Sequence, residues 1–407
     1  MKKLFSFFLI CIFLTPGIYA FDKIAAKHVE DRTFEISLGI SANLSNNFFS
    51  IRDILSEILV IDLDKFAFGV KADLGVEMPM HLNLNLKKWG IGLFSGINAS
   101  GALGLHENML SLKSATDDKS DLNAAVFFYA GINSFFHIQR FKVKIKPAVY
   151  YPLLYVVPVS PQRIYYTFDS YNDTNRIDLG YYMRVYSAFQ IDAMTGMSDF
   201  NLTALPGFDI CAGVEYPLSE VTGLEEKYPF LDFDIGLDFI NIPIISSKMK
   251  NYIQSSGNIY IKRDESENLD DLINSFTGSV NYSTINGVDS DYSVFRTFKL
   301  LVWSNWRPLS GSSLFTITPV VGFAHNALFY KTISVEAGLN LQLNVNNIFI
   351  VNAGINYNDR VWKNSINLAF NCRLLQIDIG ADVRSPDFIG SWTAKGFNAK
   401  VGLKLGW

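Results

Sequence analysis

Charged residues, cysteines and histidines are all scarce in this chain of 407 residues. Charged residues make up 18% of it, against roughly 25% in a typical globular domain. A disordered chain is excluded, because disorder requires low hydrophobicity and few aromatics, whereas here 49% of residues are hydrophobic and 14% are aromatic. The formal net charge of -4 and the absence of a Lys/Arg-rich patch argue against a nucleic-acid partner. The composition indicates a membrane protein.

Long hydrophobic runs are also missing after the N-terminus. No later stretch holds 18 consecutive apolar residues, which excludes a helical membrane protein. The apolar run Leu4 to Leu14 follows Lys2 and Lys3 and precedes the small residue Ala20, a pattern typical of a secretory signal peptide. It is shorter than the ~20 residues that an uncleaved anchor would need. We therefore expect a signal peptide over residues 1–20 and a mature chain over 21–407.

The residues that usually carry catalysis are few. The five histidines include no pair at metal-binding spacing, and no G-x-S-x-G nucleophile elbow occurs. Of the two cysteines in the mature chain, Cys211 shares its strand parity with Asp209 and Glu215, and Cys372 shares its parity with Leu368 and Phe370. We expect them on opposite faces and without a disulfide, which requires Cβ atoms about 4 Å apart. The sequence predicts no enzyme, no cofactor and no metal site.

Strict alternation of apolar and other residues recurs along the whole mature chain and predicts strands with two different faces. The C-terminal segment shows it well, because Phe397, Val401 and Trp407 alternate with Asn398, Lys400 and Gly406. The predicted strands are Phe34 to Ile40, Phe66 to Leu86, Ile91 to Leu105, Leu122 to Ile132, Phe141 to Tyr151, Ile177 to Val185, Phe208 to Tyr216, Leu231 to Phe239, Phe298 to Trp306, Phe315 to Phe323, Ile333 to Val345, Phe349 to Tyr357, Trp362 to Cys372, Leu375 to Val383 and Phe397 to Trp407.

These segments favour an all-β fold, a closed antiparallel transmembrane β-barrel, over a soluble sandwich. Segments of about ten residues, an apolar face and a mixed small or polar face are the signature of such barrels, and a bilayer forbids open sheet edges. Short turns at the periplasmic end and long outer loops require an even strand number. We expect 14 strands, with 16 as the alternative, because Ile177 to Val185 fits a local hairpin in an outer loop. The long outer loops are placed at about 152–206 and 242–297.

Two segments have helical rather than strand spacing. Between Ser50 and Ile61 the apolar residues stand at helical intervals behind a capping pattern, and a shorter case follows at Leu269 to Phe276. We expect one or two short amphipathic helices, lying at the barrel rim or membrane interface or, alternatively, entering the lumen as a hatch. The candidate hatch residues are Ile51, Ile54, Leu55, Ile58 and Leu59.

The few charges with strand parity fall on the face opposite the apolar one. Charges facing lipid cost about 2–4 kcal/mol near the midplane, so this parity identifies the lumen side. Neighbouring strands can pair Asp378 and Asp382 with Lys400 and Lys404, and barrel closure brings Glu35 beside the last strand. They either neutralise the interior or form a solute path, with the triple-Lys and triple-Asp strands as opposed walls. The candidate residues are Glu35, Lys142, Lys144, Lys146, Asp232, Asp234, Asp238, Asp378, Asp382, Lys400 and Lys404.

One hairpin carries a family resemblance. Gly207-Phe208-Asp209 and Gly213-Val214-Glu215-Tyr216, followed by Leu231 to Gly236, resemble the middle hairpin of barrels related to the long-chain fatty-acid transporters. The terminal Trp407 resembles the aromatic ending that the outer-membrane barrel-assembly machinery recognises. The resemblance implies 14 strands, an N-terminal hatch and inward passage of hydrophobic molecules. The Asn-Pro-Ala type element of that hatch is missing, so no substrate residue carries over.

These observations predict a channel or transporter in the outer membrane of a diderm bacterium, embedded in lipid and admitting small solutes, hydrophobic ones among them. A surface protein whose long loops bind host or partner molecules is the alternative. A barrel hydrolase is the third hypothesis, and the scarcity of catalytic motifs argues against it.

Overall fold

The computed structural model describes most of the chain after residue 31. The described residues are 32–47, 70–86, 88–105, 121–157, 165–171, 174–192, 196–223, 228–264, 280–309, 314–325, 333–358, 360–372, 374–393 and 395–407. The expected signal peptide, the Ser50 to Ile61 helix with its hatch residues, and the Leu269 to Phe276 helix lie outside these ranges.

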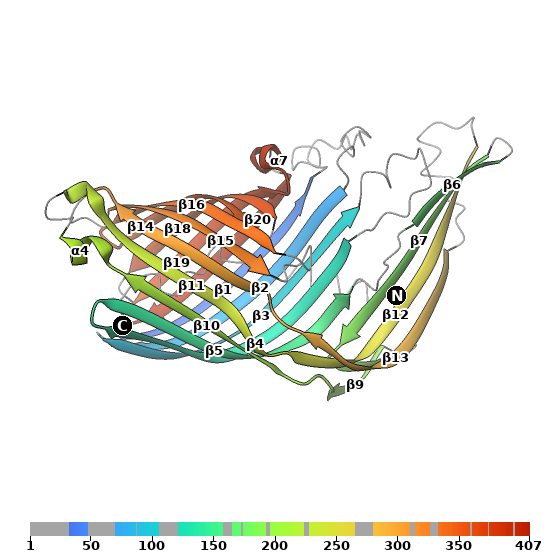
Figure 1. The fold of residues 1–407 in the computed structure, drawn as a ribbon, viewed down its shortest axis with the longest axis horizontal. Helices are drawn as coiled ribbons and strands as arrows, with labels where there is room; N and C mark the ends of the chain where they lie inside the picture. The colour runs from blue at the N-terminus through green and yellow to red at the C-terminus, as the bar shows by residue number, and fades with distance from the viewer. Residues whose placement is uncertain are drawn as a thin grey trace.

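Fourteen antiparallel strands form a closed ring, which confirms the predicted barrel and rules out the alternative of 16 (Figure 1). Closure comes from β20 pairing with β1, where Ile40 stands opposite Val401. The ring contains β1 (Phe34–Asn46), β2 (Val70–Asn85), β3 (Trp89–Leu105), β4 (Asp121–Ile138), β5 (Phe141–Val157), β10 (Gly207–Tyr216), β11 (Asp232–Ile245), β14 (Phe298–Arg307), β15 (Phe315–His325), β16 (Ser334–Val345), β17 (Phe349–Asn358), β18 (Val361–Cys372), β19 (Leu375–Ser385) and β20 (Gly396–Gly406).

The alternation of the sequence becomes an apolar outer face and a polar inner face. On β20, Val401, Leu403 and Leu405 are 40–51% exposed, whereas Asn398, which has the opposite parity, is fully buried. Large apolar side chains are exposed in the same way on β1, β3, β16 and β18. Exposed apolar residues in this number are stable only in contact with lipid, so the fold is that of an outer-membrane β-barrel. In the described part of the chain, no helix is long and apolar enough to cross a membrane.

Short turns join the strands at one end of the barrel. Gln139 and Arg140 connect β4 to β5, and the turn from β16 to β17 begins with Asn346 (φ 54°) and Asn347 (φ 57°). Asparagine enters this left-handed region more readily than most residues, so these positions suit a tight reversal. The C-terminus and the helix α4 (Leu218–Thr222) lie at this end, on the left of Figure 1. We refer to it as the short-turn end and to the opposite end as the loop end.

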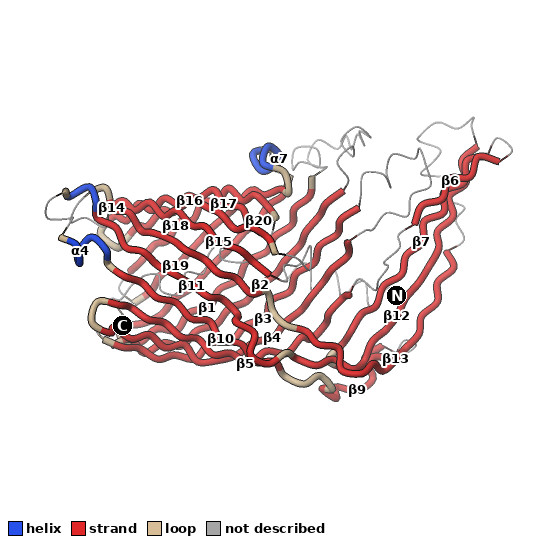
Figure 2. The backbone as a smooth tube through the Cα atoms, in the orientation of Figure 1, coloured by secondary structure: helices blue, strands red, loops and turns tan. Residues whose placement is uncertain are grey.

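At the loop end the sheet branches into an extension made of β6 (Tyr165–Tyr171), β7 (Thr174–Ser187), β12 (Ser247–Asp264) and β13 (Val280–Val294). β5 pairs with β10 up to Tyr150 opposite Gly207, and then pairs with β7 from Leu154 onward. Past this branch β12 pairs with β7 and β13. Figure 2 shows these strands diverging from the ring on the right.

The extension corrects part of the sequence prediction. Ile177 to Val185 lies in β7, which forms a hairpin with β6 outside the ring, as expected. The strands β12 and β13 and the small pair β8 (Phe189–Asp192) and β9 (Gly196–Leu202) were missed. β12 and β13 do carry apolar residues on one parity, such as Ile259 and Ile261 or Val288 and Val294, but polar residues interrupt the alternation.

The helices that the structure describes are short and were not predicted. Besides α4 they are the 3-10 turn η2 (Pro229–Leu231) and α7 (Phe388–Trp392), which joins β19 to β20 at the loop end. Ser391 of α7 is fully buried and its hydroxyl accepts a hydrogen bond from Asn364 Nδ2 at 2.9 Å. This contact fastens α7 to the barrel through β18.

Candidate solute path along the inner face

Amide and hydroxyl side chains dominate the inner face of β16 to β20 and β1, which we call the amide wall. The strand registers align one row of them across the whole wall, from β16 to the first strand of the barrel. Residues far apart in the sequence therefore become neighbours perpendicular to the strands. The row consists of Gln342, Asn352, Asn367, Gly380, Lys400 and Ser41.

A cavity of about 350 Å³ lies against the amide wall. Every residue of the aligned row contributes to its lining, together with Asp378 and Lys404. The last two form a loose ion pair, with Lys404 Nζ 3.9 Å from Asp378 Oδ2 and both side chains nearly a third exposed. The volume lies at the lower end of the ~300–1,000 Å³ usual for small-molecule sites.

A charged network occupies the loop end of the same wall. Arg384 Nε lies 2.8 Å from Asp382 Oδ1, and Arg384 Nη1 lies 3.6 Å from Asp73 Oδ2 on β2. Asn398 donates its amide to Asp382, and the Ser45 hydroxyl donates to Asp73. These side chains tie β1, β2, β19 and β20 together where the barrel closes.

The inner face of β3, β4, β5 and β10, which we call the aromatic wall, has a different character. Its rings are at most 8% exposed although they face the interior. The reason is that the rings lie against glycines of adjacent strands: a Cβ at Gly90 would stand 2.1 Å from the Phe135 ring, and one at Gly207 would stand 2.1 Å from that of Tyr150. Aromatic rings that cover glycines in this way rigidify a curved sheet. The rings are those of Phe94, Phe127, Tyr129, Phe135 and Tyr150.

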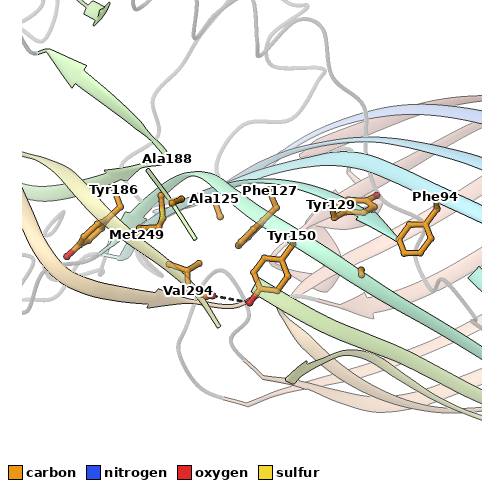
Figure 3. Close-up of a cluster of buried hydrophobic side chains, with 11 residues drawn as sticks. Phe94, Ala125, Phe127, Tyr129, Tyr150, Tyr186, Ala188, Met249 and Val294 are labelled. Atoms are coloured by element: carbon orange, nitrogen blue, oxygen red, sulfur yellow. Dashed lines mark hydrogen bonds between the residues drawn. The ribbon is translucent and has the colours of Figure 1, made fainter. Parts of the chain in front are cut away.

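Tyr150 connects the aromatic wall to the branch of the sheet. Its hydroxyl lies 3.1 Å from the carbonyl oxygen of Val294, at the end of β13, and 3.3 Å from that of Ile245, at the end of β11. Figure 3 shows this hydrogen bond to Val294 and the neighbouring rings of Phe127 and Tyr129. The side chain thus holds both segments that lead into and out of the extension.

A buried ion pair lies beside Tyr150. Arg296, in the link between β13 and β14, donates two hydrogen bonds of 2.7 Å to the carboxylate of Asp209 on β10. Its guanidinium carbon lies 4.9 Å from the Tyr129 ring centroid and 5.5 Å from that of Tyr150. Two-pronged Arg–carboxylate bonding combined with ring contact is favourable for a desolvated charge pair. The pair fixes the link at the branch.

The predicted arrangement of the triple-Lys and triple-Asp strands as opposed walls is wrong. Both strands, β5 and β11, pair with β10, so a single strand separates them. Lys144 stands opposite Gly213, and Gly213 stands opposite Asp238, which places the two charges in one row. The error arose because parity fixes the face of a residue but not the order of strands around a ring.

Charged side chains of β5 and β11 contact aromatic rings or opposite charges within the protein. Lys146 Nζ lies 4.9 Å from the Phe94 ring and Lys142 Nζ 5.9 Å from the Phe135 ring. On β11 both Asp232 and Asp234 bind Arg307, with shortest distances of 2.6 Å. Asp238, which is fully buried, accepts a 2.9 Å hydrogen bond from Trp303 Nε1.

Pairing of the remaining predicted charges follows the expectation only in part. Asp378 pairs with Lys404 as expected, but Asp382 pairs with Arg384 of its own strand rather than with Lys400. Glu35 does lie beside the last strand, opposite Gly406, while its ion pair is with Arg32 at 3.8 Å.

The cysteines and the C-terminal residue stand where parity placed them. Cys211 is buried on the inner face and Cys372 is exposed, and neither forms a disulfide with the other. Trp407 is 68% exposed, and its ring lies 4.8 Å from that of Phe34. Its role as an assembly signal stays a prediction.

The arginines were missed by the sequence prediction. Arg307 shares its parity with the inner residue Trp303, and Arg384 shares its parity with Asp378 and Asp382, so alternation alone could have placed both on the inner face. Arg296 lies outside any strand, and no local pattern indicates its partner. Among the described residues no group of three or more His, Cys, Asp or Glu side chains is arranged to hold a metal ion.

Comparison with known proteins gives similarity in structure only. No protein-family model matches the chain, and no curated protein matches its sequence. The toluene transporter TodX of Pseudomonas putida is 8% identical, with 92% of this chain and 89% of that chain covered and a TM-score of 0.48. The toluene transporter TbuX of Ralstonia pickettii is also 8% identical, with 92% and 90% covered and a TM-score of 0.48. The translocator domain of the autotransporter NalP from Neisseria meningitidis is 9% identical, with 95% and 91% covered and a TM-score of 0.31.

Proposed function

We propose that this protein is an outer-membrane channel that admits small solutes through the barrel interior. The single observation that carries the proposal is the cavity of about 350 Å³ against the amide wall. A barrel whose interior served only for stability would be filled by side chains, as small barrels are. Here half-buried polar side chains face a space instead.

The two walls give the path chemically different sides. The amide wall offers hydrogen-bond donors and acceptors to the cavity, whereas the rings of the aromatic wall are at most 8% exposed. A solute in this path therefore contacts mainly the amide wall. Of the lumen residues predicted from parity, Lys400, Lys404 and Asp378 line the cavity.

Ion conductance across planar lipid bilayers tests the proposal. We expect discrete current steps from purified, folded protein, with folding checked by the altered gel migration of an unheated barrel. The absence of steps from protein that is demonstrably folded would contradict the channel.

A binding role for the extension is the second candidate, supported by its position beyond the ring at the loop end (Figure 1). Gln254 pairs with Ile285, so residues 255–284 can be replaced by a short turn without separating β12 from β13. We expect the shortened barrel to conduct like the full chain. Lost adhesion to host cells together with an absence of conductance in either form would favour the surface-binding role.

A further inference from the structure

The cavity on the amide wall has a lining that is specific in its chemistry. It holds amides, hydroxyls, two ammonium groups and one carboxylate together with aliphatic residues such as Ile350, Ala369 and Pro79, and no aromatic ring. The inner-face glycines Gly39, Gly380 and Gly402 are also part of the lining. A site for a purely apolar solute would be lined mainly by hydrophobic and aromatic groups instead.

Two amide side chains of the cavity form no hydrogen bond with other described residues. Gln342 and Asn352 stand directly opposite each other on β16 and β17 and are half-buried. Each amide supplies one acceptor oxygen and two donor hydrogens.

A third amide has a fixed orientation. Gln376 Nε2 donates a 2.7 Å hydrogen bond to Asp378 Oδ1, and because a carboxylate only accepts, the nitrogen and oxygen of this amide cannot be exchanged. Gln376 Oε1 is therefore an acceptor, and it has no partner among the described residues. Asn367 Oδ1, in the same wall, also has none. Both oxygens are covered by surrounding atoms, so the polar groups that remain accessible from the cavity are those of the half-buried Gln342 and Asn352.

We propose that this cavity is a binding site for a neutral, hydroxyl-rich solute of the sugar or polyol class. Each hydroxyl group both donates and accepts, which matches the amides of Gln342 and Asn352 beside the Nζ donors of Lys400 and Lys404. A metal cation would be repelled by these two ammonium groups. The proposal specifies the solute class of the channel proposed above and rests on that function.

Binding of glucose to the purified full-length barrel in detergent tests the site without requiring conductance. We expect saturable binding by ligand-observed NMR, and about a tenfold loss in the double variant Gln342→Met/Asn352→Leu, which keeps side-chain size but removes both amides. Asn98→Leu is the matched control, because Asn98 is a half-buried inner-face amide of β3 that does not line the cavity. It should bind glucose like the unchanged protein.

Three outcomes would overturn the site. The first is no glucose binding by folded protein, and the second is an equal loss of glucose binding in the control variant. The third is that the unchanged protein binds benzene and the double variant binds benzene about tenfold more weakly. The two proposals fail separately. Conducting pores that bind no glucose would remove the site and leave the channel, whereas glucose binding by a folded barrel that never conducts would remove the channel and leave the site.

Discussion

The aromatic wall and the amide wall line one interior, but they differ in how closely their side chains are packed. In the aromatic wall, Phe135 and Tyr150 lie against Gly90 and Gly207 of neighbouring strands, and Tyr150 is fully buried while Phe135 is 6% exposed. On the amide wall Asn367 and Lys400 also lie over a glycine, Gly380, but the aligned row of side chains borders a cavity. The comparison teaches that a barrel interior is not uniform: one side is packed like a core and supports the branch of the sheet, and the other keeps polar groups available.

The ion pairs of the two walls differ in the same sense. Arg296 and Asp209 are 12% and 2% exposed and bond through two 2.7 Å contacts, whereas Lys404 and Asp378 are 28% and 30% exposed at 3.9 Å. A buried pair that loses one partner leaves an uncompensated charge, while a solvated pair loses little. Matched substitutions in the aromatic wall and the amide wall can therefore compare how much each ion pair contributes to the free energy of unfolding.

The largest effect is expected from Arg296→Ala. Removing the guanidinium leaves the buried carboxylate of Asp209 without its two-pronged partner, and we expect the free energy of unfolding to fall by about 3–5 kcal/mol. Urea unfolding of the refolded barrel, followed by tryptophan fluorescence, measures this loss. A change below about 1 kcal/mol would show that the branch is not held by this pair.

A smaller effect is expected where a methyl group enters the aromatic wall. The Cβ of Gly207→Ala would stand 2.1 Å from the Tyr150 ring, and overpacking of this kind costs about 1–3 kcal/mol. Gly402→Ala on the amide wall is the control, because its Cβ would meet Asp378 at 3.3 Å. There the entropy gain of about 0.5–1 kcal/mol from replacing glycine offsets a slight shift of the neighbour. Equal losses of stability in the two variants would remove the distinction between the walls.

The smallest effect is expected from Lys404→Ala. Its ion pair with Asp378 is 3.9 Å long and both side chains are nearly a third exposed. We therefore expect the free energy of unfolding to fall by less than about 1 kcal/mol in the same measurement. Ion selectivity should respond more than stability: removing one positive charge from the cavity lining shifts the reversal potential in a salt gradient toward cation preference. An unchanged reversal potential in a conducting variant would place the ion path away from this cavity.

Much of the fold was predictable because strand parity is a local property. The face of Cys211, Lys400 or Leu403 follows from its immediate neighbours, since successive side chains point to opposite sides of a strand. Alternation and the requirement for an even number left 14 or 16 strands, and 14 was preferred because Ile177 to Val185 fitted a hairpin in an outer loop. β12 and β13 were missed because polar residues interrupt the alternation of their apolar residues.

The candidate site was predictable only as a set of inner-face residues. Nothing in the sequence indicates that Gln342, Asn367 and Lys400 share one row, because that row depends on the register of five successive strands. The same limit explains the wrong expectation that the Lys and Asp strands oppose each other.

The sequence by itself determined that this chain forms a lipid-embedded barrel and which side chains face inward, because a two-residue period and the cost of charges in lipid act within each strand. The tertiary structure alone decided that β5 and β11 flank β10, that the sheet branches beside Tyr150 and Arg296, and that amides from distant strands border one cavity. Those features depend on hydrogen-bond register and ring closure, which join residues hundreds of positions apart.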